Sequence, residues 1–167
     1  KGKDILTFKP SELKLIRRKI QIIFQDPQAS LNSRMRIGTI IKRTLDIHTK
    51  LTSNSKRERV MELLNLIGLG SEHYNRFPHE LSGGQQQRVA IARSLSNDPK
   101  IIAADEPTGN LDLATGAAVM DLLFELKERT GATLLLITHD HELATRCDRT
   151  VSVADGRIVD DIRQRAA

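Results

Sequence analysis

The sequence predicts an α/β fold whose core is a parallel sheet. Two short apolar runs, at 100–104 and 133–137, flank a segment in which apolar residues return at helical spacing. Short apolar strands separated by an amphipathic helix are typical of a parallel sheet that helices cover on both faces. The 167 residues, of which 39% are hydrophobic, are enough to bury one such core without disulfides.

The first half of the chain is expected to contribute one strand and three helices. Residues 19–24 are rich in β-branched and aromatic side chains, which favour a buried strand. Apolar residues return at helical spacing over 37–50 and again over 55–67. A third helix is expected to begin at Ser82, because its hydroxyl can cap the first turn.

The second half is expected to continue as strand, helix, strand and hairpin. The two strands are the apolar runs at 100–104 and 133–137. A closing hairpin is expected around Asp155-Gly156, which separates two runs rich in β-branched residues. The helix between the strands carries an apolar stripe made of Val119, Leu122, Leu123 and Leu126.

Composition and charge exclude several classes of protein. No apolar run approaches the roughly 18 residues of a membrane span, and the apolar content is too high for a disordered chain. The 26 Lys and Arg against 21 Asp and Glu give a net charge of +5, but four Phe, one Tyr and no Trp leave little for stacking on bases. We therefore expect no nucleic-acid partner. A single cysteine, Cys147, and no secretory segment indicate a cytoplasmic protein.

The first motif with chemical meaning is Leu81-Ser82-Gly83-Gly84-Gln85. Its two glycines leave backbone N–H groups uncovered at a predicted helix start, and Ser82 adds a hydroxyl. Free N–H groups and the positive end of the helix dipole favour a phosphate, so residues Ser82 to Gln85 are candidates for nucleotide binding. The alternative is an ordinary capped helix.

Two carboxylates, Asp105 and Glu106, follow the apolar run that ends at Ala104. Ligands of open α/β sheets bind beyond the carboxyl ends of the strands. At that place Asp105 can hold Mg²⁺, directly or through water, and Glu106 can orient or deprotonate an attacking water. The alternative is a polar loop without a chemical role.

Three further residues are candidates for the same site. His139 follows the run at 133–137 and can donate to a γ-phosphate oxygen, the alternative being a polar segment that caps a helix. Gln25 follows the first strand, and its amide oxygen can contact a metal ion or a water. Asp112 lies in a turn-rich loop that could carry it to a neighbouring surface.

In this order along the chain, the motifs resemble those of the ATP-binding cassette (ABC) family. Residues 81–85 (LSGGQ) look like the family signature, 101–106 (IIAADE) like its Walker B strand with the catalytic glutamate, and 109–112 (GNLD) like its D-loop. His139 is similar to the switch histidine and Gln25 to the Q-loop residue. The resemblance covers nearly the whole chain.

The resemblance implies a P-loop NTPase-like (RecA-like) sheet with a helical insert specific to the family. It divides the chain into three parts. Residues 1–26 would form a core strand and the Q-loop, residues 27–97 a helical subdomain with the signature, and residues 98–167 a core part with Walker B, D-loop and H-loop.

The resemblance also implies partners and ligands. Two cassettes of this family face each other head to tail, with ATP between the P-loop of one and the signature of the other, and the closing of the pair drives transmembrane permease subunits. The chain would therefore lie on the inner face of the cell membrane. The residues implied to act are Glu106, His139 and Gln25 in ATP hydrolysis, Asp105 and Gln25 at Mg²⁺, and Ser82, Gly83, Gly84, Gln85 and Asp112 at ATP.

One motif of the family is missing from these 167 residues. No lysine stands in the pattern G-x-x-x-x-G-K-[ST], and the start at Lys1-Gly2-Lys3 looks like a point downstream of that loop. The loop supplies the backbone cradle and the lysine charge for the β- and γ-phosphates. We therefore expect a cassette truncated before its P-loop, with unpaired sheet edges, that binds ATP weakly and hydrolyses it negligibly.

The two halves resemble different branches of the family. Residues 22–35 and 74–95 look like oligopeptide and dipeptide importer cassettes, whereas 104–112, 134–140 and 155–161 look like the lipoprotein-release and macrolide-export type. A recombined chimera explains this, as does an importer-like cassette with an unusual second half. Because the helical insert contacts the permease in relatives, the resemblance favours peptide import.

Two other functions stay open on the sequence alone. A non-catalytic fragment or accessory chain would supply LSGGQ and the D-loop in trans to a partner that holds an intact P-loop. An ABC-type ATPase of DNA repair or translation would predict a long coiled-coil insertion or tandem cassettes, and the sequence contains neither.

Overall fold

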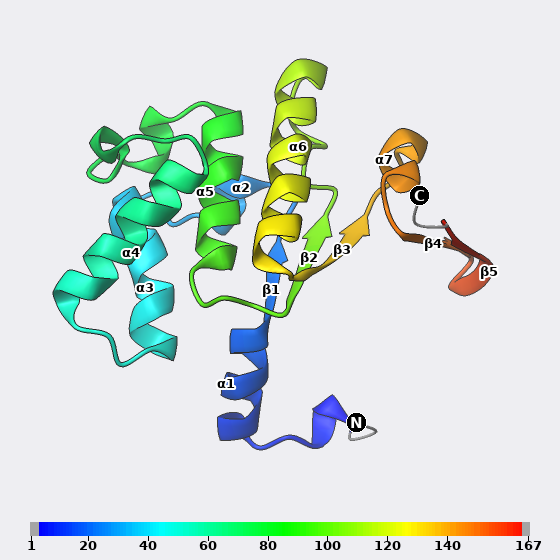
Figure 1. The fold of residues 1–167 in the computed structure, drawn as a ribbon, viewed down its shortest axis with the longest axis horizontal. Helices are drawn as coiled ribbons and strands as arrows, with labels where there is room; N and C mark the ends of the chain where they lie inside the picture. The colour runs from blue at the N-terminus through cyan, green and yellow to red at the C-terminus, as the bar shows by residue number, and fades with distance from the viewer. Residues whose placement is uncertain (1–3, 165–167) are drawn as a thin grey trace.

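The structure, a computed structural model, describes residues 4–164 and comprises a small parallel sheet, a group of helices and a separate hairpin (Figure 1). The segment Lys1-Gly2-Lys3, which the sequence predicts to follow a phosphate loop, lies outside the described residues. Short 3₁₀ helices occupy Ile5–Thr7, Ser71–His73 and Pro78–Glu80. The other elements are α1 (Pro10–Lys19), β1 (Ile20–Ile23), α2 (Pro27–Ser30), α3 (Ile37–His48), α4 (Ser53–Leu66), α5 (Gly83–Leu95), β2 (Ile101–Asp105), α6 (Leu113–Thr130), β3 (Thr133–Ile137), α7 (His141–Thr145), β4 (Arg149–Ala154) and β5 (Arg157–Arg163).

The parallel sheet predicted from the apolar runs is present, with the strand order β1-β2-β3. β2 is the middle strand, and its Ile101 lies opposite both Ile20 of β1 and Thr133 of β3. Because all three strands run in the same direction, their carboxyl ends meet at one edge of the sheet, the upper edge in Figure 1. The predicted α/β class is therefore confirmed.

Helices cover one face of this sheet and leave the other face open in the described part of the chain. The face toward α5 and α6 carries Ile23, Ile102 and Ala104, all of them buried. Ile22 and Leu135 lie on the opposite face of the sheet and are exposed. Side chains of a strand point alternately to the two faces, and only one face has helical neighbours here. The expectation that helices cover both faces is thus wrong for residues 4–164.

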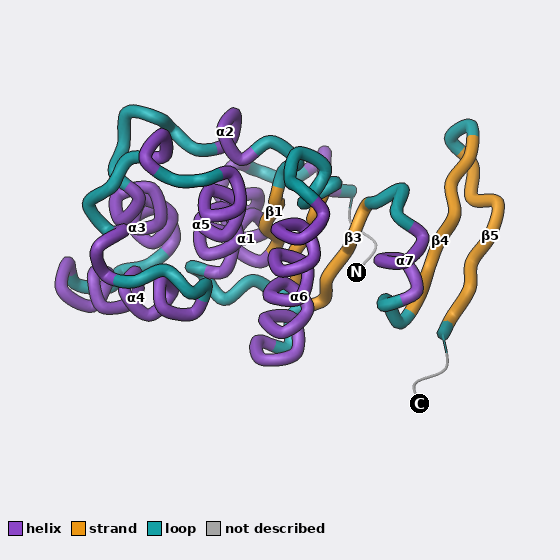
Figure 2. The backbone as a smooth tube through the Cα atoms, turned by 90° about the horizontal axis from the view of Figure 1, so that it is seen from above, coloured by secondary structure: helices purple, strands orange, loops and turns teal. Residues whose placement is uncertain are grey.

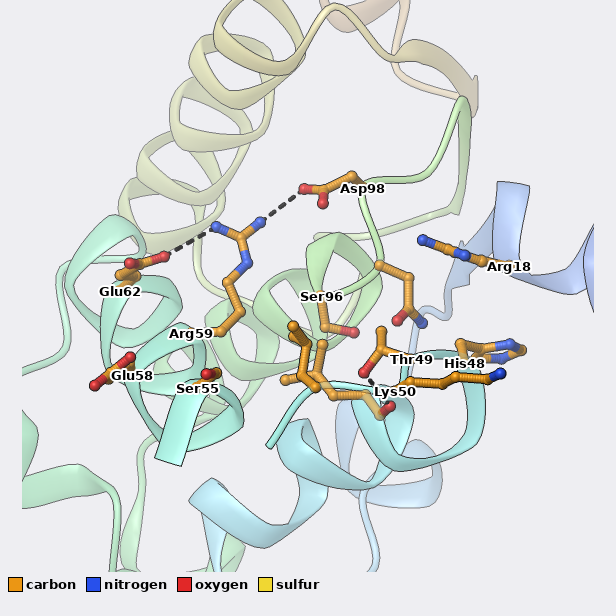
Figure 3. Close-up of a pocket in the computed structure, with 13 residues that line it drawn as sticks. Arg18, His48, Thr49, Lys50, Ser55, Glu58, Arg59, Glu62, Ser96 and Asp98 are labelled. Atoms are coloured by element: carbon orange, nitrogen blue, oxygen red, sulfur yellow. Dashed lines mark hydrogen bonds and ion pairs between the residues drawn. The ribbon is translucent and has the colours of Figure 1, made fainter. Parts of the chain in front are cut away.

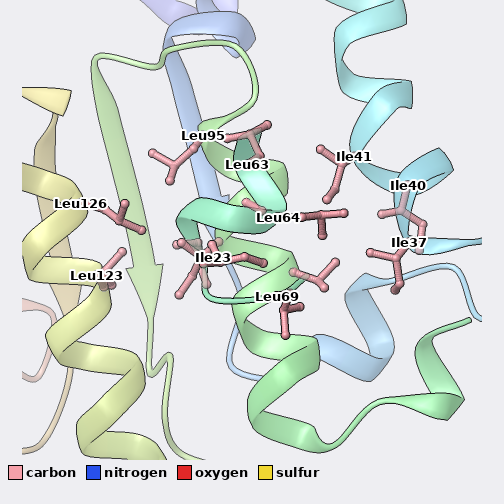
Figure 4. Packing of buried hydrophobic residues seen from close by; sticks show 14 of the residues in the cluster. Ile23, Ile37, Ile40, Ile41, Leu63, Leu64, Leu69, Leu95, Leu123 and Leu126 are labelled. Atoms are coloured by element: carbon pink, nitrogen blue, oxygen red, sulfur yellow. The ribbon is translucent and has the colours of Figure 1, made fainter. Parts of the chain in front are cut away.

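The helices α3, α4 and α5 share a single apolar core with the sheet (Figure 4). Ile41 of α3 and Leu64 of α4 are fully buried and belong to the same cluster as Ile23 of β1 and Leu123 of α6. α5 lies in the middle, because it packs against α3 and α4 as well as against β1 and α6. The predicted stripe of α6 also lies in this core, although its Leu122 is only half-buried.

The three helices predicted in the first half are confirmed with small shifts at their ends. α3 ends at His48 rather than at residue 50. α4 begins two residues before the expected start, because the hydroxyl of Thr52 accepts a hydrogen bond from the N–H of Ser55 at 3.2 Å. Ser82 is the residue that caps α5, as the sequence predicts.

The pattern of apolar residues does not reveal α1, α2 and α7. Each is short, so the evidence for it in the sequence is a cap or a proline rather than a periodic stripe. α1 begins with Pro10. The carboxylate of Asp26 accepts hydrogen bonds from the first turn of α2, and that of Asp140 does the same for α7.

The closing hairpin is confirmed as β4 and β5, which pair antiparallel. Asp155 (φ +49°) and Gly156 (φ +73°) form its turn, where both residues need the left-handed region. Arg149 and Asp161 join the two strands through two hydrogen bonds of 2.7 and 2.6 Å. Figure 2 shows the hairpin beyond β3, on the side of the sheet away from α3 and α4.

The shared core makes a direct prediction for stability. Leu64→Ala removes a fully buried side chain from the centre of the helical group, so it should lower the free energy of unfolding by about 2–5 kcal/mol. Urea denaturation followed by circular dichroism measures this change. Leu113→Ala is the matched control, because Leu113 is 94% exposed and its replacement should change the stability by less than about 0.5 kcal/mol. An equal loss in both variants would contradict the assignment of the core.

Candidate functional site

The three parallel strands bring four of the predicted site residues to one edge of the sheet. Gln25 follows β1 by two residues, Asp105 ends β2 with Glu106 directly after it, and His139 follows β3 by two residues. Carboxyl ends of parallel strands lie side by side, so these side chains share the upper edge in Figure 1. This is the place at which open α/β sheets bind their ligands.

The backbone holds Glu106 in an unusual conformation. Its φ of +42° lies in the left-handed region, which is costly for a residue with a side chain. The N–H of Glu106 donates to the carbonyl oxygen of Ile137, the last residue of β3, at 2.9 Å. The turn after β2 is therefore fixed to the end of the neighbouring strand, and the Glu106 carboxylate is directed by the backbone.

Glu106 and His139 form a close pair. The Oε1 atom of Glu106 accepts a hydrogen bond from the N–H of His139 at 2.9 Å and lies 2.6 Å from its Nδ1. A carboxylate only accepts, so Nδ1 carries the hydrogen and the other ring nitrogen, Nε2, points elsewhere. The side chain of Glu106 is 23% exposed and that of His139 is 86% exposed. The imidazole is therefore accessible to a ligand, while the carboxylate keeps one oxygen, Oε2, for a water.

Gln25 and Asp105 line a hollow of about 420 Å³ at this edge. Gly109 lies beside the Gln25 amide, since a Cβ at Gly109 would stand 2.7 Å from its Nε2. In the described part of the chain no three His, Cys, Asp or Glu side chains gather as a metal site. One carboxylate and one amide oxygen suit Mg²⁺, which takes few protein ligands and completes its shell with water and phosphate oxygens.

The signature segment begins α5 with a reciprocal pair of hydrogen bonds. The Ser82 hydroxyl oxygen accepts from the N–H of Gln85 at 3.3 Å, and the Gln85 amide oxygen accepts from the N–H of Ser82 at 3.0 Å. The N–H groups of Gly83 and Gly84 have no acceptor within residues 4–164. The capped helix is thus confirmed, and capping leaves two N–H groups without an acceptor at the positive end of α5.

The start of α5 packs directly on the start of α6. Thr115 stands where a Cβ of Gly84 would have to lie, and a Cβ on Gly83 would reach the Leu111 side chain at 3.4 Å. Glycines at these two positions thus let the signature approach the loop that carries Asp112. The Asp112 carboxylate accepts from the Thr115 N–H at 3.0 Å and caps α6. Asp112 also lines an open hollow of about 400 Å³ between α6 and α7.

Sequence reasoning missed two residues of α5 that hold the Gln25 segment in place. The Gln87 Nε2 atom donates to the carbonyl oxygen of Phe24 at 3.3 Å, and the Arg93 Nη1 atom donates to that of Ser30 at 2.6 Å. Gln87 is fully buried, and burial lowers the pKa of Arg93. The sequence signal that could have identified them is the presence of polar residues on the buried face of an amphipathic helix, because buried polar groups need hydrogen-bond partners. The two bonds grip both ends of the segment that contains Gln25.

The grip of Gln87 can be tested by hydrogen exchange. Gln87→Leu removes one hydrogen bond to the segment 24–30, so amide exchange there should rise about threefold to tenfold. Hydrogen–deuterium exchange with mass spectrometry reports this segment separately from the rest. Gln86→Leu is the matched control, because Gln86 donates to the carbonyl oxygens of Pro78 and Leu81 instead. A similar rise in both variants would show a general loosening and contradict the specific role.

The cap of α6 should make stability depend on pH. Hydrogen bonds from the side chain and the N–H of Thr115 hold the pKa of Asp112 below its ordinary value of 3.8. A carboxylate whose pKa is lower in the folded than in the unfolded protein stabilises the fold at pH values above its unfolded pKa. This stabilisation is lost as the pH falls through its folded pKa. Thermal melts of Asp112→Asn should therefore lie below those of the wild type near about pH 6, with the gap narrowing toward about pH 3. A gap that stays constant with pH would contradict this.

Comparison with known families and proteins agrees with this geometry. The family model described as "ABC transporter" matches residues 1–109. The dipeptide transport ATP-binding protein DppF of Escherichia coli is 44% identical over 139 residues, which are 83% of this chain and 42% of that protein. The oligopeptide transport ATP-binding protein OppF of Streptococcus mutans is 44% identical over 161 residues, 95% of this chain and 52% of that protein. The chain thus spans about half the length of these relatives or less.

Solved structures show the same fold. The dimeric ATP-binding cassette MJ0796, in a post-hydrolysis state bound to ADP and Pi, matches 96% of this chain and 70% of its own with a TM-score of 0.80 and 36% identity. CbiO1 of Clostridium perfringens, part of the transporter complex CbiONQ, matches 92% of this chain and 60% of its own with a TM-score of 0.82 and 31% identity. From the family model, the close relatives and the shared fold it follows that this chain belongs to the ABC transporter family.

Proposed function

We propose that the chain is the ATP-binding and ATP-hydrolysing part of a cassette that energises peptide import. The observation that carries the proposal is the Glu106–His139 pair, 2.6 Å apart, at the strand edge that also holds Gln25 and Asp105. A fixed carboxylate, a nearby imidazole and a pair of metal-ligand oxygens are groups that hydrolysis of a nucleoside triphosphate uses, together with a phosphate loop whose motif is not among these 167 residues.

The pair supports a division of labour in hydrolysis. The bound Oε1 keeps Glu106 in place, so its Oε2 can accept a hydrogen bond from the attacking water and direct it in line with the γ-phosphate. The exposed ring of His139 leaves Nε2 on the side away from Glu106, where a hydrogen on it would be directed at the γ-phosphate oxygens. The strained turn at Glu106 holds this geometry before the substrate arrives.

Asp105 and Gln25 would hold Mg²⁺ at the same edge. When bound, the ion neutralises charge on the β- and γ-phosphate oxygens. The chain contributes the position of the two ligands: Asp105 lies at the end of a paired strand, and Gln87 and Arg93 of α5 fix the backbone on either side of Gln25. The oxygen character of the two ligands and their shared hollow support this assignment.

The signature would act on ATP held by a second cassette. The exposed Ser82 and Gly83, with the N–H groups of Gly83 and Gly84 that no acceptor in residues 4–164 satisfies, would form an anion site at the start of α5. Exposed Asp112 and Leu113 follow it on the loop that packs against the signature. The dimeric state of MJ0796 supports a pair of cassettes as the working form, arranged head to tail as the family resemblance implies.

Peptide import is the favoured substrate class because the named relatives are dipeptide and oligopeptide transport proteins. No helix in residues 4–164 is long and apolar enough to cross a membrane. We therefore propose that the chain attaches to the inner face of the cell membrane through permease subunits, with residues 27–97 as the contacting subdomain between core parts at 1–26 and 98–167. The resemblance of the second half to export-type cassettes would then concern the core part at 98–167 and not the surface that contacts the permease.

Transport in proteoliposomes tests this function. The 167-residue chain is combined with a partner cassette that has its own P-loop and with peptide-importer permease subunits, and ATP-driven peptide uptake is measured. Glu106→Gln should lower the uptake by about 100-fold or more if the chain hydrolyses ATP itself. Glu125→Gln, a change of an exposed carboxylate on α6 outside the proposed permease-contacting subdomain, is the control and should have no effect.

The alternative function predicts a different pattern in the same assay. A chain that only supplies its signature in trans would tolerate Glu106→Gln and lose uptake with Ser82→Arg, which places a large side chain at the free N–H groups of α5. Indifference to both variants would contradict either function. Stimulation only by permease subunits of a lipoprotein-release transporter would overturn the assignment to peptide import.

A further inference from the structure

A second and larger groove lies at the opposite end of the sheet from the candidate nucleotide site. Its volume is about 890 Å³, within the size range of small-molecule sites. Arg18 precedes β1 and Asn97 precedes β2, so the groove lies at the amino ends of these strands. Its lining comprises Arg18, Leu45, His48, Thr49, Lys50, Leu51, Ser55, Glu58, Arg59, Glu62, Ser96, Asn97 and Asp98.

The charges of this groove are separated between two sides. Figure 3 shows Arg18, His48 and Lys50 on one side and Glu58 and Glu62 on the other. Within residues 4–164, Arg18, Lys50 and Glu58 have no ion-pair partner. The groove therefore offers two free cations at one side and a free carboxylate at the other.

Arg59 forms ion pairs with the other two carboxylates of the groove. It donates to Glu62 at 3.2 Å and to Asp98 at 2.7 Å, as the dashed lines in Figure 3 mark. These bonds tie α4 to the turn before β2 and account for three of the charged residues. Glu58 alone is left over on that side of the groove.

Asn97 is the buried polar group of the groove that has no partner. It is only 3% exposed, and neither its Nδ2 nor its Oδ1 finds a hydrogen bond within the described chain. A buried amide without partners is costly, so the two polar atoms of Asn97 require a water or a ligand group to complete them. An amide offers one donor group and one acceptor, the pair that a peptide bond complements.

We propose that this groove binds a short peptide with free ends, its carboxylate at Arg18 and Lys50, its ammonium group at Glu58, and a peptide bond at Asn97. Leu45 and Leu51 add an apolar surface for side chains of the peptide. A phosphate-bearing molecule would use only the basic side and leave Asn97 Oδ1 and Glu58 unused. The peptide is the ligand that engages the free charges and the unpaired amide together.

The electrostatics of the basic side agree with a carboxylate there. Burial, together with the positive charges of Lys14 and Arg18, lowers the pKa of His48. Lys14 and Arg18 thus gather positive charge around His48, and an anion is the species that relieves their mutual repulsion. The negative ends of α1 and α3 lie on this side as well, but their partial charges fall short of the full charges on Arg18 and Lys50.

A peptide bound in this groove would signal to the cassette that transported material is present, and this regulatory role rests on the proposed function. The binding itself does not. Peptide binding uses groups at the opposite end of the sheet from Glu106 and requires neither ATP nor a permease. Loss of transport with intact peptide binding, or the reverse, therefore separates the two proposals.

Calorimetric titration of the 167-residue chain tests the site. The probes are trialanine, trialanine amide, N-acetyl-trialanine and the peptide blocked at both ends. Arg18→Gln should weaken trialanine about tenfold and leave trialanine amide unchanged, because only the free carboxylate uses that charge. Glu58→Gln should weaken trialanine about tenfold and leave N-acetyl-trialanine unchanged.

Further variants distinguish binding from a structural role. Asn97→Leu should abolish trialanine binding while raising the melting temperature, since it removes an unpaired buried amide. Arg17→Gln is the matched control, a neighbouring cation on α1 outside the lining, and should change neither property. Equal affinity for the doubly blocked peptide, displacement of trialanine by inorganic phosphate, or no binding at millimolar trialanine would each overturn the proposal.

Discussion

The structure depends on the burial of α5 between the helical group and the sheet. This helix packs against α3 and α4 on one side and against β1 and α6 on the other, and almost every side chain along its middle is buried. It therefore joins what would otherwise be two small cores into a single apolar cluster. A core of this size is what allows a three-stranded sheet with one open face to keep its strands in register in the described chain.

The same helix connects two functional segments. Its first turn presents the free N–H groups of Gly83 and Gly84, and its interior holds the Gln25 segment through Gln87 and Arg93. Both the signature and Gln25 thus move with one rigid element. These two hydrogen bonds connect α5 directly to the carbonyl oxygens of Phe24 and Ser30, on either side of Gln25.

The two ends of the sheet have different electrostatic character. At the carboxyl ends, the carboxylates Asp105 and Glu106 lie near Gln25 and His139, a set of groups that suits a metal ion and a polar ligand. At the amino ends, separated charges and an unpaired amide surround a larger groove. The polarity follows from chain direction, because parallel strands place all their following loops at one edge and all their preceding loops at the other.

The sequence by itself determined the class of fold, the strands and main helices, and the residues that follow each strand, because apolar periodicity and caps are local properties. It also identified Gln25, Asp105, Glu106 and His139, since a strand's end is visible in the chain. Only the tertiary structure decided that Glu106 Oε1 binds His139, that Gln87 and Arg93 grip the Gln25 segment, and that Asn97 is buried without a partner. These contacts join residues tens of positions apart, and no local pattern of side chains encodes which distant carbonyl or amide a packed helix will meet.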